Sequence, residues 1–208
     1  LEPVVKRYSQ HFKVVVVTGP RQVGKTTMLK HLMEQESQER DIARSYVSLD
    51  NTSIRQVAKT DPALFLQRYH PPILIDEIQK APELLPYIKE VVDSSEQTGL
   101  FWLTGSQPFH LMSAVSESLA GRAGVVEMLG LSASEIYGAP SETFGATPDY
   151  FMRRVSTRQA RDVTEVYADI CKGSLPAIRA LPDDLRAGGY ESYLDTYIMR
   201  DIRDLAQV

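Results

Sequence analysis

The sequence predicts an α/β fold in which a five-stranded parallel sheet is sandwiched by helices and followed by a small helical part. Short apolar runs alternate with longer runs at helical spacing, as expected when a crossover helix joins each strand to the next. The apolar runs are continuous, which is typical of strands buried on both faces of a parallel sheet. With 208 residues, 43% of them hydrophobic, the chain can form one full domain and a smaller appendage.

The first predicted strand covers residues 13–17, where four valines follow a lysine. The other strands are predicted at 45–49, 72–76, 100–104 and 125–129. These segments are rich in β-branched, leucine and aromatic residues, which suit a buried pleated surface.

Helices are predicted between these strands. One runs from Thr26 to about residue 34, and a short one begins at Asp61-Pro62, a capping residue followed by proline in the first turn. A third, at 84–92, carries its apolar residues on one face, and a fourth is predicted at about 108–119.

Turn-forming residues are dense between 138 and 148, where we place the domain boundary. We assign 1–138 to the core, 139–188 to a small helical domain and 189–208 to a further helix. That helix carries an apolar stripe into which Asp201 falls, and we expect Asp201 to pair with an arginine or with the site described below. Since the chain begins without methionine and ends inside a helical pattern, we expect it to be a piece of a longer protein.

The composition excludes several classes of protein. The net charge of −4 does not indicate a nucleic-acid partner, although it is compatible with a local basic patch. The single cysteine, Cys171, cannot form an intrachain disulfide and fits a reducing cytoplasm. No apolar run approaches the roughly 20 residues that span a bilayer, so we expect no membrane partner.

The strongest motif follows the first predicted strand and opens a helix. It matches G-x-x-x-x-G-K-[ST] and consists of Gly19, Pro20, Arg21, Gln22, Val23, Gly24, Lys25 and Thr26, followed by Thr27. Glycines allow the backbone to curl so that successive N–H groups point at phosphate oxygens. We expect Lys25 to reach the β- and γ-phosphates of ATP and the hydroxyl of Thr26 to bind Mg²⁺.

A second motif consists of two carboxylates, Asp76 and Glu77, at the end of the apolar run that begins at Pro72. Asp76 is expected to hold Mg²⁺, directly or through water, and Glu77 to orient and deprotonate the attacking water. Adjacent acids at a strand end can also be solvated loop residues, and the phosphate-binding loop upstream decides against that alternative.

Two further positions are candidates for contact with the γ-phosphate. The strand at 100–104 ends in Thr104 and is followed by Ser106 and Gln107, whose polar groups could contact the γ-phosphate or the water, or could only cap a turn. Arg122 precedes the fifth predicted strand and could stabilise developing phosphate charge, in its own site or in a neighbour's. The alternative is a solvated arginine at a helix end.

In their order and spacing, the four motifs at 19–26, 72–77, 103–107 and 119–122 resemble those of an AAA+ ATPase. The strings Gly-Pro-Arg-Gln-Val-Gly-Lys-Thr-Thr and Asp-Glu-Ile-Gln-Lys-Ala-Pro are similar to those of a group of prokaryotic predicted ATPases that carry a second, C-terminal domain. The resemblance covers essentially the whole chain and implies that most of that domain lies outside it.

The resemblance implies the strand order 5-1-4-3-2, which brings Ser106 and Glu77 together over the γ-phosphate. It places Arg122 where AAA+ proteins commonly carry an arginine finger. The helical domain becomes a lid, in which Gly173-Ser174-Leu175-Pro176 looks like the glycine-proline motif of signal-transducing ATPases. Pro176 would then contact the nucleotide, and Arg179 is the candidate lid arginine. Ser106 stands where many AAA+ proteins have asparagine.

The sequence therefore predicts a Mg²⁺-dependent ATPase whose turnover drives conformational change in attached domains. The alternative is an ATP-dependent switch or scaffold with little turnover. A small-molecule kinase is disfavoured because the adjacent acid pair suits water activation, and guanine specificity is disfavoured because no Asn-Lys-x-Asp string occurs. The protein's own C-terminal domain is an expected partner. The sequence does not decide whether the chain forms a homo-oligomer or acts on a nucleic-acid or protein client.

Overall fold

The computed structural model describes residues 1–40, 42–106, 113, 115, 117–139, 144–156 and 161–198. The chain divides into two compact units, Leu1–Leu129 and Gly130–Val208. Of the sequence predictions, Gln107, Asp201 and most of the helix at 108–119 lie outside the described residues.

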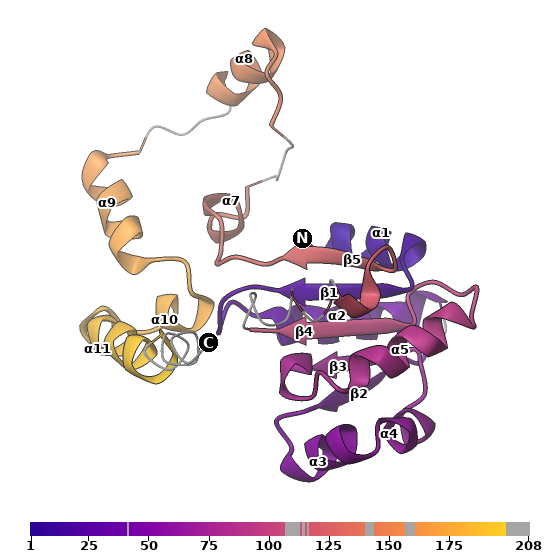
Figure 1. Cartoon of the computed structure of the whole chain (residues 1–208). Helices are drawn as coiled ribbons and strands as arrows, with labels where there is room; N and C mark the ends of the chain where they lie inside the picture. Colours follow the sequence, from indigo (N-terminus) through magenta and orange to yellow (C-terminus); the bar gives the residue numbers. More distant parts are fainter. Residues whose placement is uncertain are drawn as a thin grey trace. The chain divides into compact units, whose positions relative to one another are not determined.

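The first unit is a parallel sheet covered by helices (Figure 1). Its strands are β1 (Val14–Thr18), β2 (Ser45–Ser48), β3 (Ile73–Asp76), β4 (Phe101–Gly105) and β5 (Ala123–Glu127). Its helices are α1 (Glu2–His11), α2 (Lys25–Arg40), α3 (Thr52–Thr60), α4 (Pro62–Arg68), the 3-10 turn η1 (Ile78–Lys80) and α5 (Leu84–Asp93). The start of α4 has the expected cap, because the side chain of Asp61 accepts a hydrogen bond from the Leu64 N–H.

The five strands lie in the order β2-β3-β4-β1-β5, and the paired strands are parallel. This is the predicted order 5-1-4-3-2 read from the other edge, so the predicted fold class is confirmed. β4 pairs with β1 on one side and β3 on the other. The ends of β1, β3 and β4 therefore meet at one edge of the sheet.

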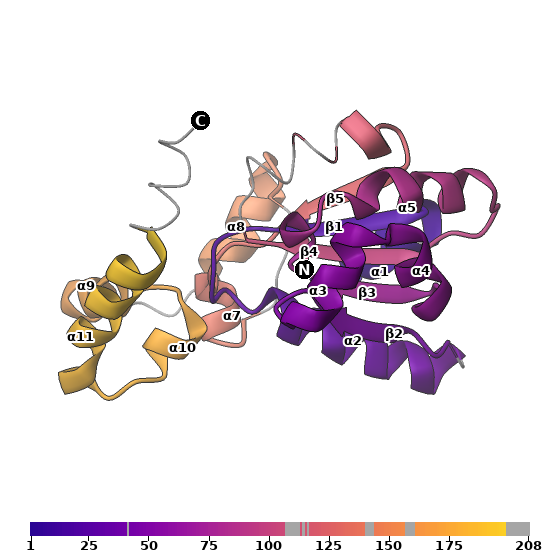
Figure 2. The same ribbon diagram turned by 60° about the horizontal axis from the view of Figure 1, so that its bottom comes forward.

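Alternate residues of the strands face two separate cores, because successive side chains of a strand point to opposite faces. Val14 and Val16 pack with α3, α4 and α5 in one core. Val15 and Val17 pack with α1 and α2 in the other, together with Trp102. The four valines of β1 are fully buried because helices cover both faces, as Figure 2 shows from below.

β5 begins and ends two residues earlier than predicted. Its five residues pair with β1 from Val14–Ala123 to Thr18–Glu127, so β1 sets its length. A glycine is needed in this strand, since a Cβ on Gly124 would lie 2.6 Å from Phe12 Cδ2. The apolar residues 128 and 129, which the prediction included, follow the last paired residue.

The described part of the second unit is helical. It contains α7 (Ala133–Ile136), α8 (Pro148–Ser156), α9 (Val163–Lys172), α10 (Pro176–Arg179), α11 (Asp183–Tyr193) and η2, a π-helical segment (Leu194–Ile198). α9 ends at Gly173, whose φ is 68°, and the Tyr190 hydroxyl donates to the Lys172 carbonyl at 3.0 Å. No helix of the described segments, in either unit, is long and apolar enough to cross a membrane.

A buried ion pair connects α2 with the strands. Arg44 Nη2 lies 3.1 Å from Glu36 Oε2, and the Arg44 guanidinium stacks 3.8 Å from the centre of the Trp102 ring. Burial lowers the pKa of Arg44, and Glu36 partly offsets this effect. The pair therefore keeps a charged guanidinium inside the fold.

We predict that Glu36→Ala lowers the free energy of unfolding by about 3–5 kcal/mol, because it leaves the Arg44 charge buried without its partner. Urea denaturation measures this loss. The control is Glu39→Ala in the same helix, where Glu39 is 59% exposed and pairs with Lys6. That pair is worth less than about 1 kcal/mol. Equal losses in the two variants would contradict the prediction.

Candidate functional site

The loop between β1 and α2 has the curled backbone that phosphate binding requires. Gly19 and Gly24 have φ values of 139° and 99°, and Gln22 has a φ of 62°. A Cβ on Gly19 would lie 2.0 Å from the Met128 carbonyl oxygen, so a larger residue does not fit. The loop leads into the N-terminus of the 16-residue helix α2, whose free N–H groups attract anions.

Lys25, the first residue of α2, is only 6% exposed. Its ammonium group donates to the carbonyl oxygens of Gly19 at 2.9 Å and Pro20 at 2.7 Å. Burial lowers the pKa of Lys25, while the nearby carboxylates of Glu77 and Asp76 raise it. The cation is thus held at the loop that would receive phosphate.

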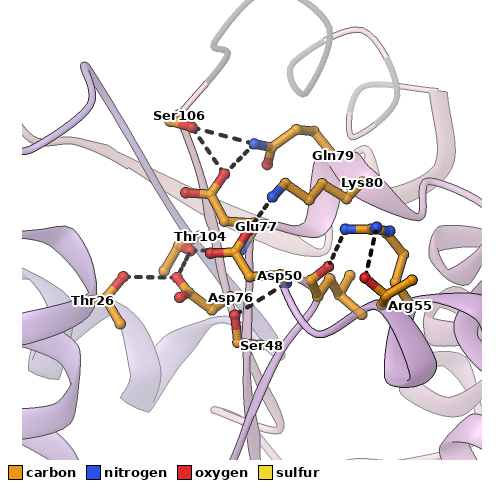
Figure 3. A network of polar contacts seen from close by, with 12 residues as sticks. Thr26, Ser48, Asp50, Arg55, Asp76, Glu77, Gln79, Lys80, Thr104 and Ser106 are labelled. Carbon is orange, nitrogen blue, oxygen red and sulfur yellow. Dashed lines mark hydrogen bonds and ion pairs between the residues drawn. The ribbon is translucent and has the colours of Figure 1, made fainter. Parts of the chain in front are cut away.

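The carboxylate of Asp76, at the end of β3, accepts hydrogen bonds from three elements, and Figure 3 shows those from Thr26 and Thr104. Thr26 Oγ1 from α2 donates to Oδ1 at 2.7 Å, and Thr104 Oγ1 from β4 donates to the same oxygen at 2.5 Å. The hydroxyl of Tyr46 in β2 donates to Oδ2 at 3.2 Å. Asp76 is consequently fixed in one orientation beside the start of α2.

The carboxylate of Glu77 lies next to Asp76 but turns toward different partners (Figure 3). Ser106 Oγ donates to Glu77 Oε2 at 2.9 Å, and the Gln79 amide donates to the same oxygen. The Glu77 N–H donates to Thr104 Oγ1 at 3.1 Å. The two adjacent acids therefore have separate environments, as two different roles would require.

The residues present fit a magnesium ion. Thr26 Oγ1 and Asp76 Oδ1 are a hydroxyl and a carboxylate oxygen only 2.7 Å apart. Mg²⁺ prefers such hard oxygen ligands and usually takes only one or two from the protein, with the rest from water and phosphate. The donor set thus suits a magnesium ion shared with a nucleotide.

Arg122 lies at the opposite end of the strands, where β1 and β5 begin. Its carbonyl accepts a hydrogen bond from the N–H of Val14, the first residue of β1, whereas the phosphate-binding loop follows the last residue of that strand. Its guanidinium pairs with Asp93 at the end of α5, with Nε 2.5 Å from Oδ1, and this hydrogen bond lowers the pKa of Asp93. The length of a five-residue strand, about 16 Å at roughly 3.3 Å per residue, separates Arg122 from the loop of its own chain.

The structure brings together Lys25, Thr26, Asp76, Glu77 and Ser106, and it does not bring Arg122 to them. Pro176 belongs to the second unit, as the first residue of α10, and its predicted contact with nucleotide stays a prediction. Arg179 pairs with Asp169 at 2.8 Å within that unit.

Sequence reasoning missed two residues of the site, Tyr46 and Gln79. Tyr46 reaches Asp76 because β2 pairs with β3 as the predicted strand order implies, but that order does not show which residue of β2 lies near Asp76. Gln79 stands two residues after Glu77 in the Asp-Glu-Ile-Gln string. That closeness in sequence was an available signal, and in the structure the contact forms across the turn that begins at Glu77.

We predict that Gly19→Ala costs well over the roughly 1–3 kcal/mol expected for a strained backbone position, since the new methyl group would meet the Met128 carbonyl. Chemical denaturation without nucleotide measures the cost. The control is Gly121→Ala, where φ is also positive, at 74°, but nothing lies within 4 Å of the new Cβ. Equal costs would show that the close approach at Gly19 does not matter.

Comparison with solved structures agrees with this fold. The Walker-type ATPase of Pyrococcus abyssi matches with a TM-score of 0.58 and 13% sequence identity, over 99% of this chain and 74% of that chain. At this identity the likeness shows the fold alone.

Comparison of sequences identifies the family. Two uncharacterized proteins, from Mycobacterium bovis and Mycobacterium tuberculosis, are each 32% identical over 153 residues. The match covers 72% of this chain and 33% of each relative, so the chain spans about a third of the length of the curated relatives it matches. A family model described as an AAA domain matches residues 11–137, more than half of the chain. The chain therefore belongs to the AAA-domain family, the AAA+ group of P-loop ATPases that its motifs resemble.

Proposed function

We propose that this domain binds Mg²⁺-ATP, hydrolyses it with water, and couples turnover to conformational change in attached domains. The observation that carries the proposal is that Lys25, Thr26, Asp76 and Glu77 gather at the edge of the sheet where β1 and β3 end. A buried cation, two oxygen ligands for a metal and a separate carboxylate are the groups that phosphoryl transfer to water needs.

Nucleotide binding rests on the loop from Gly19 to Gly24 and on α2. The backbone N–H groups of the loop and the first turn of the helix cradle the phosphates. The ammonium group of Lys25 donates to the carbonyls of Gly19 and Pro20 in the structure. In this proposal it exchanges these two acceptors for phosphate oxygens. In this proposal Pro176 of the second unit contacts the adenine ring of the nucleotide.

Thr26 and Asp76 hold the magnesium ion. A magnesium ion held by these two residues would supply positive charge that offsets the charge of the phosphates. The Thr104 and Tyr46 hydroxyls hold the Asp76 carboxylate in position for this task. Its orientation therefore does not depend on Thr26 alone.

Glu77 acts as the general base. Its Oε2 is engaged by Ser106 and Gln79, which leaves Oε1 to accept a proton from the attacking water. Lys25 stabilises charge on the γ-phosphate during the attack, and Ser106 acts by orienting the base.

Arg122 completes the site of a second copy of the chain. The length of β1 lies between Arg122 and its own loop, and this separation supports a role in a neighbour's site rather than in its own. Its side chain is 34% accessible, which is compatible with insertion into a neighbour's site once it leaves Asp93. The proposal thus includes a homo-oligomer as the active form.

The coupling to attached domains rests on chain length. The relatives are about three times as long as the part this chain matches, so a nucleotide-driven change has further domains on which to act. In this proposal the second unit and the C-terminal domain that the family resemblance implies are the recipients of that change.

We predict that Glu77→Gln lowers kcat by about 10²–10⁴-fold while ATP binding persists, because the amide cannot take the proton from water. Lys25→Ala should abolish both binding and turnover. Phosphate release in the presence of ATP and Mg²⁺ measures turnover, and Glu90→Gln, an exposed position of α5, is the control. An unchanged rate in Glu77→Gln would exclude the base role, and tight ATP binding by the parent without turnover would favour the switch.

A mixing experiment tests the role of Arg122 in a neighbouring site. Arg122→Ala should lower kcat by about 10³–10⁵-fold, as removal of an arginine finger does. When the Arg122→Ala variant is mixed with the Glu77→Gln variant, part of the parent activity should return. Glu77 of the first variant and Arg122 of the second then form one intact composite site. The specific activity of the parent should rise with protein concentration. Arg68→Ala, an exposed arginine at the end of α4, is the control. No recovery in the mixture would contradict the prediction.

A further inference from the structure

We infer that Gln79 is a positioning residue for hydrolysis, which fixes the Glu77 carboxylate by donating a hydrogen bond from its side-chain amide. The inference rests on the proposed function, since it assigns Gln79 a role through the proposed base.

Glu77 has a left-handed backbone conformation, with φ 60° and ψ 47°, which is uncommon for a residue with a long side chain. The chain therefore reverses at once into η1, and the Lys80 N–H donates to the Glu77 carbonyl at 2.9 Å. Because of this reversal, Gln79 can reach back to a carboxylate only two residues earlier in the sequence. In an extended strand the two side chains would share a face with their Cα atoms roughly 6.6 Å apart.

Gln79 also contacts the other group that holds Glu77. Its Nε2 lies 3.3 Å from Ser106 Oγ, so Gln79, Ser106 and Glu77 form a closed triangle of polar contacts (Figure 3). Ser106 is 3% exposed and Gln79 is half-buried. Two donors on one oxygen restrict rotation of the carboxylate and leave its other oxygen for the water.

The position of the Gln79 side-chain amide costs folding stability. Its Oε1 is buried and has no hydrogen-bond partner among the described residues. An amide turned the other way would place that oxygen against the Glu77 carboxylate, so the observed orientation is the one that the carboxylate selects. A buried acceptor without a partner is the kind of local cost that proteins retain at functional sites.

The test is a double-mutant cycle on the 208-residue chain, with phosphate release from Mg²⁺-ATP as the readout. Gln79→Ala and the isosteric Gln79→Glu, which cannot donate when ionised, should each lower kcat about tenfold and leave the KM for ATP unchanged. In the Glu77→Gln background the same substitutions should change the residual rate by less than about twofold, because the carboxylate that Gln79 positions is gone. Gln56→Ala, an exposed glutamine of α3, should behave like the parent.

Three outcomes would overturn the inference. An unchanged kcat in both Gln79 variants would show that Ser106 alone suffices. An equal loss in the parent and the Glu77→Gln background would show that Gln79 acts independently of the base. If Glu77→Gln itself matches the parent, the proposed function fails and the inference fails with it. The rate of the single Glu77→Gln variant therefore separates the last case from the other two.

Discussion

The hydroxyl of Thr104 connects the strands of the site. It is completely buried, it donates to Asp76 at 2.5 Å and it accepts the N–H of Glu77 at 3.1 Å. One oxygen atom thereby fixes both the carboxylate proposed to hold the metal and the backbone of the residue proposed as base. Because β4 lies between β1 and β3, the same strand carries Thr104 to this point and Ser106 to the carboxylate of Glu77.

The two faces of the sheet keep this arrangement rigid. Helices α3, α4 and α5 seal one face and α1 and α2 the other, so the strand ends cannot shift relative to one another without opening a core. The Arg44–Glu36 pair and the stacking on Trp102 add a polar link between α2 and β4. α2 also carries Lys25 and Thr26, and therefore packing of this helix positions two of the residues proposed to hold the phosphates and the metal.

Most of the fold could be predicted because its signals are local. The continuous valines of β1 and the cap at Asp61 each depend on a few adjacent residues, and both predictions match the structure. The end of β5 could not be predicted in this way. Residues 128 and 129 are as apolar as the strand itself, and only pairing with β1 decides where the strand stops.

For the site, the sequence by itself determined the phosphate-binding loop and the acid pair, since each is a contiguous string whose residue types carry the chemistry. Tertiary structure decided which groups surround them. Thr26 and Thr104 reach Asp76 from positions 50 and 28 residues away in the sequence, and Tyr46 reaches it from a neighbouring strand. The structure also separated Arg122 from its own loop by the length of β1. The physical reason is that spacing along a chain fixes contacts only within a turn or a helix, whereas strand order and register decide which distant residues share an edge of the sheet.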